Sequence, residues 1–412
     1  MIRSSKHSLK FVNHSKRQEL KIFFVEYRRL LQAIIDKLWV DGLEEFGLDI
    51  QSNQLDCLSM LPNDYLKTFD SWLTARMKQC VGKQVCSMVK AAVAKRKKQL
   101  YMLAKLQRNG DKTKHLQRKI DTQPLVKPNA DHAKLELDSR FIDFKESQHF
   151  DSFVRIKTIG NKLELLLPIK YTKVSHKWSK LGEMKDSIRL EENSLHLIYE
   201  IPDLVKKTEG LVVGADQGQT TVLSLSDNQV TSPNEHGYDL TKIQSRLACR
   251  KKGSNGFRRT QEHRKNYINW SLNQLNFSKT KEVKLEKIKG LRYKQRSSRL
   301  MSHWAYTLIK DKLVDLSEVE GFKLTEVANE FRSQRCSQCG WVCKANRKGK
   351  TFKCNICGFT KDADLNAASN LSLDLHEVPF WVRSSKINRK GFYWKPNGLF
   401  SKDHEPIVRD TK

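Results

Sequence analysis

Four cysteines in the second half of the chain have the spacing of a zinc site. They form two C-x2-C pairs, Cys336 with Cys339 and Cys354 with Cys357, and 14 residues separate the pairs. Each pair offers two thiolates to one tetrahedral ion, and the residues between the pairs can close as a hairpin. A glycine follows each pair, which suits the turn after a zinc knuckle. We therefore predict a structural Zn²⁺ site, with no open position for chemistry because all four ligands are thiolates.

The other five cysteines need different explanations. Cys343 lies between the two pairs and is an alternative ligand to Cys339, although the symmetry of the C-x2-C pairs favours Cys339. The remaining four are scattered, and we expect them to fill hydrophobic cores. They are Cys57, Cys80, Cys86 and Cys249.

Three carboxylates are candidates for the chemistry that a closed zinc site does not perform. Asp216 follows the apolar run "LVVGA", Glu286 ends the alternating run "EVKLE", and Asp364 precedes the helix-forming run "LNAASNL". Each alone is typical of a turn, an exposed strand position or a helix N-terminus. Together they provide hard oxygen ligands for two Mg²⁺ ions, the arrangement that hydrolyses phosphodiesters. Glu282 and Glu326 remain alternatives to Glu286.

The zinc pairs and the third carboxylate are almost contiguous. Asp364 comes seven residues after Cys357, which leaves little room for a loop between them. A rigid zinc ribbon in this position would fix the Asp364 carboxylate and guide a nucleic-acid strand towards the metal ions. If so, removal of zinc should alter the position and the activity of Asp364.

The hydrophobic pattern predicts the elements that carry these residues. A short strand opens the chain, and a helical stripe follows at Leu20, Phe24, Tyr27, Leu31, Ile34 and Leu38. Helical character continues to about residue 120, and beyond a Pro-containing linker the period becomes two, which predicts a small antiparallel barrel. After residue 205 strands alternate with helices, which predicts an α/β domain. The expected parts are a first barrel strand (1–14), a helical insert (15–125), the remaining barrel strands (126–205), the first part of the α/β domain (206–335), the zinc ribbon (336–358), the last part of the α/β domain (359–372) and a basic C-terminal tail (373–412).

Composition narrows the class of partner. The 412 residues are enough for two or three domains. With 76 Lys and Arg against 46 Asp and Glu, the formal net charge is +30, which indicates a polyanion, and nucleic acid is the leading candidate. No apolar run approaches the roughly 18 residues of a membrane span, and the N-terminus lacks the apolar stretch of a signal peptide. We therefore expect a cytoplasmic protein with no membrane partner.

Four motifs in order resemble one family. "GADQG", "VKLEKIKGLR", "SQRCSQCG" with "CNICG", and "DADLNAASNL" are similar to the RuvC-type nuclease domain of transposon-encoded TnpB proteins and of their descendants, the compact type V CRISPR effectors. The resemblance is specific over about residues 205–371, and it places Asp216, Glu286 and Asp364 on the catalytic positions and the four paired cysteines on the zinc ligands. It also selects Asp364 over Asp362. One departure is Lys287, where the family has Asp or Asn after the glutamate.

The resemblance implies a fold and a function. The fold would be multidomain α+β, with a β-barrel interrupted by a helical recognition insert, then a RuvC/RNase H-like α/β nuclease domain containing an inserted zinc ribbon. The function would be RNA-guided DNA cleavage dependent on Mg²⁺, with a guide RNA and double-stranded target DNA as partners. Basic helical regions at 89–120 and 246–265 would hold nucleic acid backbone.

Several questions stay open at this point. A guide-dependent repressor that does not cleave, and an RuvC-like nuclease independent of RNA, are alternative functions. A monomer is favoured over a dimer.

Four aromatic residues near the basic regions are candidates for stacking on bases: Tyr101, Phe257, Tyr267 and Trp270. For Tyr267 and Trp270, packing in the helix core is the favoured role.

Overall fold

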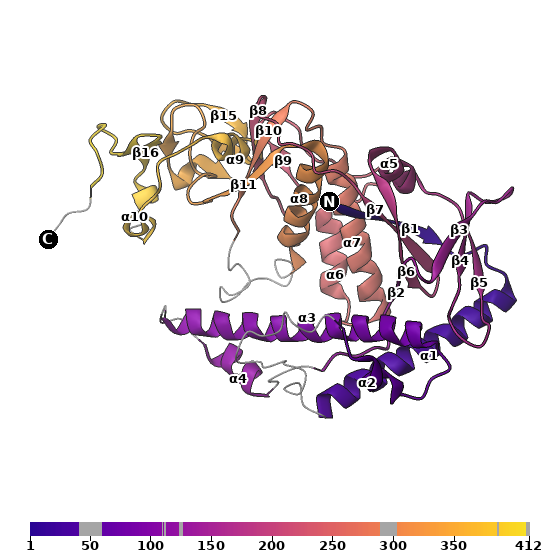
Figure 1. Cartoon of the computed structure of the whole chain (residues 1–412). Coiled ribbons are helices and arrows are strands. Elements are labelled where there is room, and N and C mark those ends of the chain that lie inside the picture. Colours follow the sequence, from indigo (N-terminus) through magenta and orange to yellow (C-terminus); the bar gives the residue numbers. More distant parts are fainter. Residues whose placement is uncertain are drawn as a thin grey trace. The chain divides into compact units, whose positions relative to one another are not determined.

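The computed structural model describes residues 1–40, 60–108, 110, 113–122, 127–288, 303–384 and 387–408 (Figure 1). These residues belong to two compact units, Met1–Pro202 and Asp203–Lys412. Both units contain helices and strands, so the chain is a mixed α/β protein of more than one domain, as its sequence predicts. None of the described helices is long and apolar enough to cross a membrane.

The first unit begins and ends with strands, and most of its helices lie between them in sequence. Its described elements are β1 (Ile2–Ser8), α1 (His14–Val40), α2 (Asn63–Lys67), α3 (Ala75–Arg108), α4 (Lys114–Thr122), β2 (Leu135–Leu137), β3 (Ile142–Lys145), β4 (Ser152–Ile156), β5 (Leu165–Ile169), α5 (Lys173–Leu181), β6 (Glu183–Glu191) and β7 (Ser194–Glu200).

Strand β1 pairs antiparallel with β7, from Ile2 opposite Glu200 to Ser8 opposite Ser194. The first strand of the unit thus returns to its last strand, and the helices α1 to α4 form an insertion between β1 and β2. This is the order that the sequence predicts. The predicted linker at 121–131 contains residues 123–126, which lie outside the described residues.

The predicted closed barrel is not found. In the described part of the unit, the strands form one sheet in the order β1-β7-β6-β2 and a second in the order β3-β4-β5. Residues from both sheets, among them Leu135, Val154 and Leu197, belong to one hydrophobic core. Alternation in the sequence predicts which side chains enter that core. It does not determine which strand edges exchange hydrogen bonds, so the barrel interpretation was wrong.

The helical stripe of α1 packs as predicted. All six stripe residues are buried, and the helix contacts α3 in the same hydrophobic core. Tyr27 on the stripe donates a hydrogen bond from its hydroxyl to Oε1 of Gln84 on α3, at 2.7 Å. Burial of a side chain of this size with its hydroxyl satisfied stabilises the α1–α3 pair strongly.

The expected basic helix divides into α3 and α4. Towards its C-terminal end α3 exposes Lys95, Lys98, Tyr101, Lys105 and Arg108, while its buried face narrows to Val93 and Leu103. Residues 109, 111 and 112 of the expected region, and residues 41–59 of the expected insert, lie outside the described residues. The described part therefore presents a long solvent-facing basic surface, the property expected of a helix that follows phosphates.

The second unit contains the α/β pattern and the cysteines. Its described elements are β8 (Leu211–Asp216), β9 (Ser224–Leu225), α6 (Leu240–Cys249), α7 (Asn255–Asn273), β10 (Thr280–Glu286), α8 (Tyr306–Glu320), β11 (Lys323–Val327), β12 (Trp341–Val342), η5 (Lys344–Asn346), β13 (Arg347–Lys348), β14 (Thr351–Lys353), β15 (Thr360–Asp362), α9 (Ala363–Ser372), α10 (Phe380–Ser384), η6 (Ile387–Arg389), β16 (Phe392–Lys395) and β17 (Gly398–Phe400).

A four-stranded sheet in the order β11-β10-β8-β9 organises this unit. Strand β10 is parallel to both β8 and β11, and β9 is antiparallel to β8. Val213, Ala215, Val283 and Leu285 enter a core formed with α6, α7 and α8. Because side chains alternate along a strand, the intervening residues face the opposite side, where α9 packs on β8 and β10.

The C-terminal residues are not the tail that the sequence predicts. Strand β16 pairs with β12 inside the cysteine segment (336–358), and β17 extends this small sheet. Phe392, Trp394 and Leu399 are buried in a hydrophobic cluster with Val342 and Val382. The basic and Pro/Gly-rich composition predicted a segment without a hydrophobic core. Its aromatic residues are instead buried by packing on the cysteine segment.

Candidate active site

Two of the predicted carboxylates end neighbouring parallel strands. Asp216 is the last residue of β8 and Glu286 the last of β10, and Ala215 lies opposite Leu285 in the ladder. Since Ala215 and Leu285 enter the core formed with α6 to α8, Asp216 and Glu286 face the side covered by α9. The backbone N–H of Gln217 donates to Oε1 of Glu286 at 3.2 Å, which joins the two strand ends.

The third carboxylate, Asp364, lies in the first turn of α9. The neighbouring Asp362 is the N-cap, and its Oδ1 accepts hydrogen bonds from the backbone N–H groups of Asp364 (2.9 Å) and Leu365 (3.0 Å). Asp362 is therefore engaged in capping the helix. Asp364 is buried, and its charge acts on both Asp216 and Glu286.

A glycine allows α9 to approach the sheet this closely. A Cβ atom at Gly214 on β8 would lie 2.0 Å from the backbone oxygen of Ala368 and 2.5 Å from the backbone nitrogen of Ser372. Any larger residue would push the helix away from the strand. The close contact places the start of α9 beside the carboxyl ends of β8 and β10 (Figure 1).

Burial and neighbouring charges shift the pKa values of two of the three carboxylates. Burial raises the pKa of Asp216 well above its usual range, and the nearby charges of Glu286 and Asp364 raise it further. Burial also raises the pKa of Glu286 to about 7, against the lowering effect of the Gln217 N–H and of Arg347. Several acids crowded in a partly dry site favour either protonation or bound cations.

Two cations from the cysteine segment contact Asp364. Arg347 on β13 donates from Nη2 to Oδ1 at 2.9 Å, and the ammonium of Lys350 pairs with Oδ2. Neither residue was among the predicted site residues. The signal that could have found them is the run of Lys and Arg between the two cysteine pairs, which must lie near Asp364 if the pairs close on one ion.

A tryptophan outside the predicted motifs also reaches the strand ends. The indole Nε1 of Trp304 donates to the backbone oxygen of Gly218 at 3.1 Å, two residues beyond Asp216. Trp304 is buried, so it holds the turn after β8 in place from the segment that precedes α8. Its position just before α8 gives no periodic signal in the sequence.

The two alternative acids have other partners. Oε1 of Glu282, four residues before the end of β10, accepts from the hydroxyl of Thr325 at 2.6 Å. Glu326 pairs with Lys310 of α8 at 2.7 Å, which places its carboxylate on the face covered by α8. The carboxylates that raise the pKa of Asp216 include Glu286 and Asp364, so the geometry favours Glu286.

The four paired cysteines come together. Their Sγ atoms all lie within 4.8 Å of one another, with Cys336 3.6 Å from Cys357 and Cys339 3.7 Å from Cys354. Cys343 is buried beside the cluster without joining it, and its sulfur accepts a hydrogen bond from Asn355 at 3.8 Å.

The scattered cysteines behave differently from one another. Cys80 and Cys86 are buried in the core of the first unit, as predicted, whereas Cys249 is exposed and is not a core residue. Cys57 lies outside the described residues.

The donor sets fit two different metals. Four sulfurs at mutual tetrahedral spacing suit a closed Zn²⁺ site. The carboxylate oxygens are hard ligands of the kind that Mg²⁺ prefers, and burial is the main cause of the raised pKa of Asp216 and Glu286. Within the described residues, the carboxylate oxygens are not gathered as tightly as the sulfurs. Asp364 is paired with Arg347 and Lys350.

The candidate stacking residues divide by exposure. Tyr267 and Phe257 are buried, and the Tyr267 hydroxyl donates to the backbone oxygen of Ser232 at 3.2 Å, so both are packing residues. Tyr101 is 61% exposed and Trp270 is 40% exposed. Trp270 lies beside the ring of Tyr267, with ring centroids 6.0 Å apart, and the rest of its side chain is accessible.

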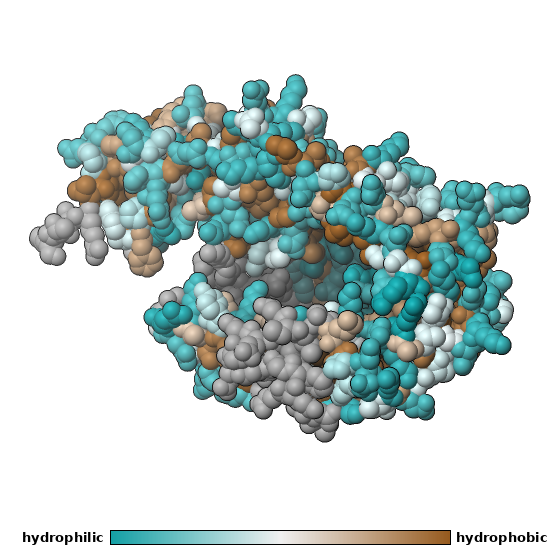
Figure 2. Space-filling model, viewed as in Figure 1, coloured by the Kyte–Doolittle hydropathy of each residue, from teal (hydrophilic) through white to brown (hydrophobic). Residues whose placement is uncertain are grey.

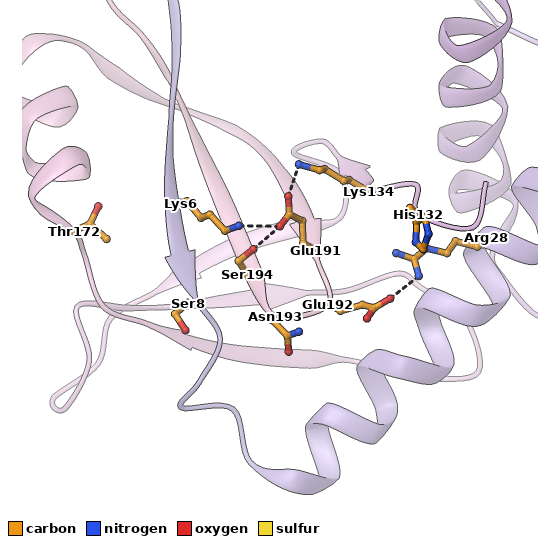
Figure 3. Close-up of a pocket in the computed structure, with 10 residues that line it drawn as sticks. All are labelled: Lys6, Ser8, Arg28, His132, Lys134, Thr172, Glu191, Glu192, Asn193 and Ser194. Atoms are coloured by element: carbon orange, nitrogen blue, oxygen red, sulfur yellow. Dashed lines mark hydrogen bonds and ion pairs between the residues drawn. The ribbon is translucent and has the colours of Figure 1, made fainter. Parts of the chain in front are cut away.

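The first unit contains a cavity of about 770 Å³ lined by both cations and carboxylates (Figure 3). Burial would raise the pKa of Glu191, but hydrogen bonds from Lys134, Ser194 and Lys6 outweigh it and hold the pKa at about 2. Arg28 pairs with Glu192 at 2.6 Å. Hydrophilic residues also cover much of the face shown in Figure 2, as expected from the charge of the chain.

Comparison with known proteins identifies relatives over the region of the site. The family model described as "Cas12f1-like, TNB domain" matches residues 306–371, which include the four paired cysteines and Asp364. The CRISPR-associated endodeoxyribonuclease Cas12f1 of Sulfoacidibacillus thermotolerans is 38% identical over 77 residues, 18% of each chain. Cas12f1 of an uncultured archaeon is 24% identical over 230 residues, 46% of this chain and 44% of that protein.

A TnpB-like protein of Aquifex aeolicus (strain VF5) is 35% identical over 95 residues, 21% of this chain and 31% of that protein. These matches span less than half the length of each relative. The resemblance to TnpB proteins and compact type V effectors, predicted from the motifs, is confirmed.

Solved structures give a weaker likeness. A Cas12f1–sgRNA–target DNA complex covers 87% of this chain and 82% of its own at 16% identity, with a TM-score of 0.47. The AacC2c1–sgRNA binary complex covers 97% and 77% at 9% identity, with a TM-score of 0.40. At these scores the likeness carries no argument about the site.

Proposed function

We propose that this chain is an RNA-guided DNA endonuclease of the TnpB type. It binds a structured guide RNA and cleaves double-stranded target DNA beside a short flanking motif, at a RuvC-like site formed by Asp216, Glu286 and Asp364. The observation that carries the proposal is the arrangement of these acids on two parallel strand ends and one helix start. Similarity to Cas12f1 endodeoxyribonucleases over residues 306–371 supports it.

Each acid has a defined part in the proposed site. The Asp216 and Glu286 carboxylates, whose pKa values burial raises, would help to hold the divalent ions and would lose their protons on doing so. Asp364 completes the ligand set from α9. The chemistry supplied by two bound Mg²⁺ ions is activation of a water molecule and stabilisation of the leaving 3′-oxygen. The four thiolates hold a structural Zn²⁺.

Arg347 and Lys350 suit a second role in this site. In the described structure they neutralise Asp364. Cations that replace them at the carboxylate would leave both side chains beside the reacting phosphate, where Arg offers a planar pair of donors and Lys a mobile charge. They would then bind and orient the DNA strand that is to be cut.

Charge distribution supports the nucleic-acid partners. The exposed cations of α3 are suited to phosphate backbone. Exposed Tyr101 and Trp270 provide flat surfaces for bases. Recognition through backbone and shape fits a protein in which base pairing with a guide reads the sequence.

The test is to purify the chain with its co-purifying RNA, sequence that RNA, and add matched double-stranded DNA with Mg²⁺. An Asp364→Asn variant removes the charge and keeps the shape, and Glu326→Gln is a matched control on the opposite face of the sheet. We expect a discrete RNA and cleavage that needs the guide match, survives Glu326→Gln and is lost with Asp364→Asn.

Other results would select other functions. Discrete RNA with guide-dependent DNA binding but no cleavage would support a repressor. Cleavage of unmatched or branched DNA without RNA would support an RNA-independent RuvC-like nuclease, and would overturn the proposal.

A further inference from the structure

The junction between the cysteine segment and α9 is made by three buried polar side chains. Arg335 immediately precedes Cys336, while Asn366 and Asn370 lie on α9. Asn366 and Asn370 are fully buried and Arg335 is 5% exposed. Polar groups this deep are costly unless each donor and acceptor has a partner.

The two asparagines bind the backbone around the first cysteine pair. Asn366 accepts at Oδ1 from the N–H of Ser337 (3.1 Å) and donates from Nδ2 to the backbone oxygen of Arg335 (2.8 Å). Asn370 donates to the backbone oxygens of Arg335 (2.7 Å) and Arg332 (3.0 Å). Both amides are therefore paired with the residues that flank Cys336.

Arg335 closes the cluster from the other side. Its Nη1 donates to Oδ1 of Asn370 at 2.6 Å and to the backbone oxygen of Cys336 at 3.2 Å. Its Nε donates to the backbone oxygen of Trp394 at 2.9 Å. The guanidinium thus links α9, the first zinc knuckle and strand β16.

The buried charge of Arg335 needs a counter-charge. Within the described residues the acceptors of its hydrogen bonds are neutral oxygens, and it directly precedes Cys336 of the cysteine cluster. Four thiolates around one divalent ion would leave an excess of negative charge beside the guanidinium.

The same helix carries the carboxylate. Asn366 and Asn370 are four residues apart and share one face of α9, and Asp364 lies two residues before Asn366, towards the strand ends. Helix α9 lies directly on Gly214 and moves as one stiff unit. A shift of the face that carries Asn366 and Asn370 therefore also moves Asp364 relative to Asp216 and Glu286.

We propose that Arg335 is a positioning residue which, together with Asn366 and Asn370, couples zinc binding by the four thiolates to the placement of Asp364. Zinc thereby regulates the carboxylate site. The inference rests on the proposed function for the identity of that site as a divalent-metal centre.

The test measures metal binding in the full chain without nucleic acid. Mn²⁺ serves as the probe, read by EPR, and the sites lost in Asp364→Asn define the carboxylate centre. Zinc content is measured in parallel by atomic emission, before and after treatment with a zinc-selective chelator. We expect zinc removal to weaken Mn²⁺ binding at this centre about tenfold, the size usual for loss of an orienting neighbour.

Variants locate the coupling. With zinc bound, Arg335→Ala and Asn366→Ala should each weaken Mn²⁺ binding by about tenfold. Removal of zinc from these variants should weaken it little further, because the substitution has already removed the contact through which zinc acts. Arg335→Lys keeps the charge and should restore part of the affinity. The matched control is Asn346→Ala, a buried amide that donates to the backbone oxygens of Gln334 and Trp341 within the cysteine segment.

The outcomes separate the inference from the proposed function. Equal Mn²⁺ affinity with and without zinc in the wild-type chain would overturn the coupling, and this measurement needs no substitution. If zinc-loaded Asn346→Ala binds Mn²⁺ as weakly as Arg335→Ala, the coupling is also overturned. The effect would then come from a general loss of structure in the cysteine segment. Failure to cleave guided DNA would overturn the proposed function and leave the metal coupling intact.

Discussion

The second unit carries two clusters of metal-binding side chains that are built in opposite ways. The four sulfurs come from two tight turns within the cysteine segment and lie within 4.8 Å of one another. The three carboxylates come from two strands and a helix, and are brought together by parallel pairing and by the contact of α9 with Gly214. The first cluster is local in sequence and the second depends on the whole sheet.

The two clusters also differ in how their charge is balanced. The thiolate cluster is closed and suits a soft divalent ion. In the carboxylate cluster, Arg347 and Lys350 neutralise Asp364 while burial raises the pKa of Asp216 and Glu286. The thiolate cluster should therefore keep its ion under conditions in which the carboxylate cluster exchanges its ions. Substitutions in either cluster test this difference.

The largest expected effect comes from removing one catalytic charge. Asp364→Asn should lower the cleavage rate by about 10³-fold or more, because metal-bridging acids act as a unit. Its zinc content should be unchanged, since no thiolate is altered. Single-turnover cleavage and atomic emission check both parts, and loss of zinc in this variant would contradict the assignment of zinc to the four thiolates alone.

Next in size is removal of one thiolate. Cys339→Ser should lose stoichiometric zinc and destabilise the second unit by several kcal/mol, because metal binding contributes directly to folding of such modules. Cys343→Ser is the matched control and should retain one zinc per chain, because its sulfur lies outside the cluster. Equal zinc loss in both variants would make Cys343 a ligand and sink the present assignment.

A pH dependence should distinguish the carboxylates from the thiolates. The pKa of Glu286 is raised to about 7 from its ordinary 4.5, so the metal-free folded chain binds a proton that the unfolded chain releases between these values. Its free energy of unfolding should therefore fall as pH rises from 4.5 to 7, by roughly 3 kcal/mol from this group.

Glu286→Gln should reduce this slope and leave the part that comes from the raised pKa of Asp216, and bound Mg²⁺ should suppress it. Denaturant titrations at a series of pH values measure it. A slope of opposite sign would show that Glu286 is ionised throughout that range in the folded chain.

The smallest effect concerns the cations of the cysteine segment. Lys350→Ala removes a half-exposed competitor for Asp364 and should tighten Mn²⁺ binding by up to about fivefold, the limit for such an ion pair. Cleavage should nevertheless slow, because a phosphate contact is lost. Mn²⁺ binding and cleavage rates measured together test this, and changes in the same direction would refute the double role of Lys350.

Features that depend on a short stretch of chain were predictable. The spacing of the cysteine pairs predicts the thiolate cluster, and the stripe of α1 predicts its buried face. Such features follow from turn geometry and from the 3.6-residue period, which few neighbours suffice to define.

Sequence alone determined that three acids follow or begin regular elements, that four cysteines form two pairs and that the chain carries an excess of positive charge. Only the tertiary structure decided that β8 pairs with β10, that Arg347 and Lys350 meet Asp364, that the first-unit strands form two sheets, and that the C-terminal residues pack on the cysteine segment. The physical reason is that pairing between distant segments depends on which surfaces remain unburied after local folding, and no local pattern encodes that choice.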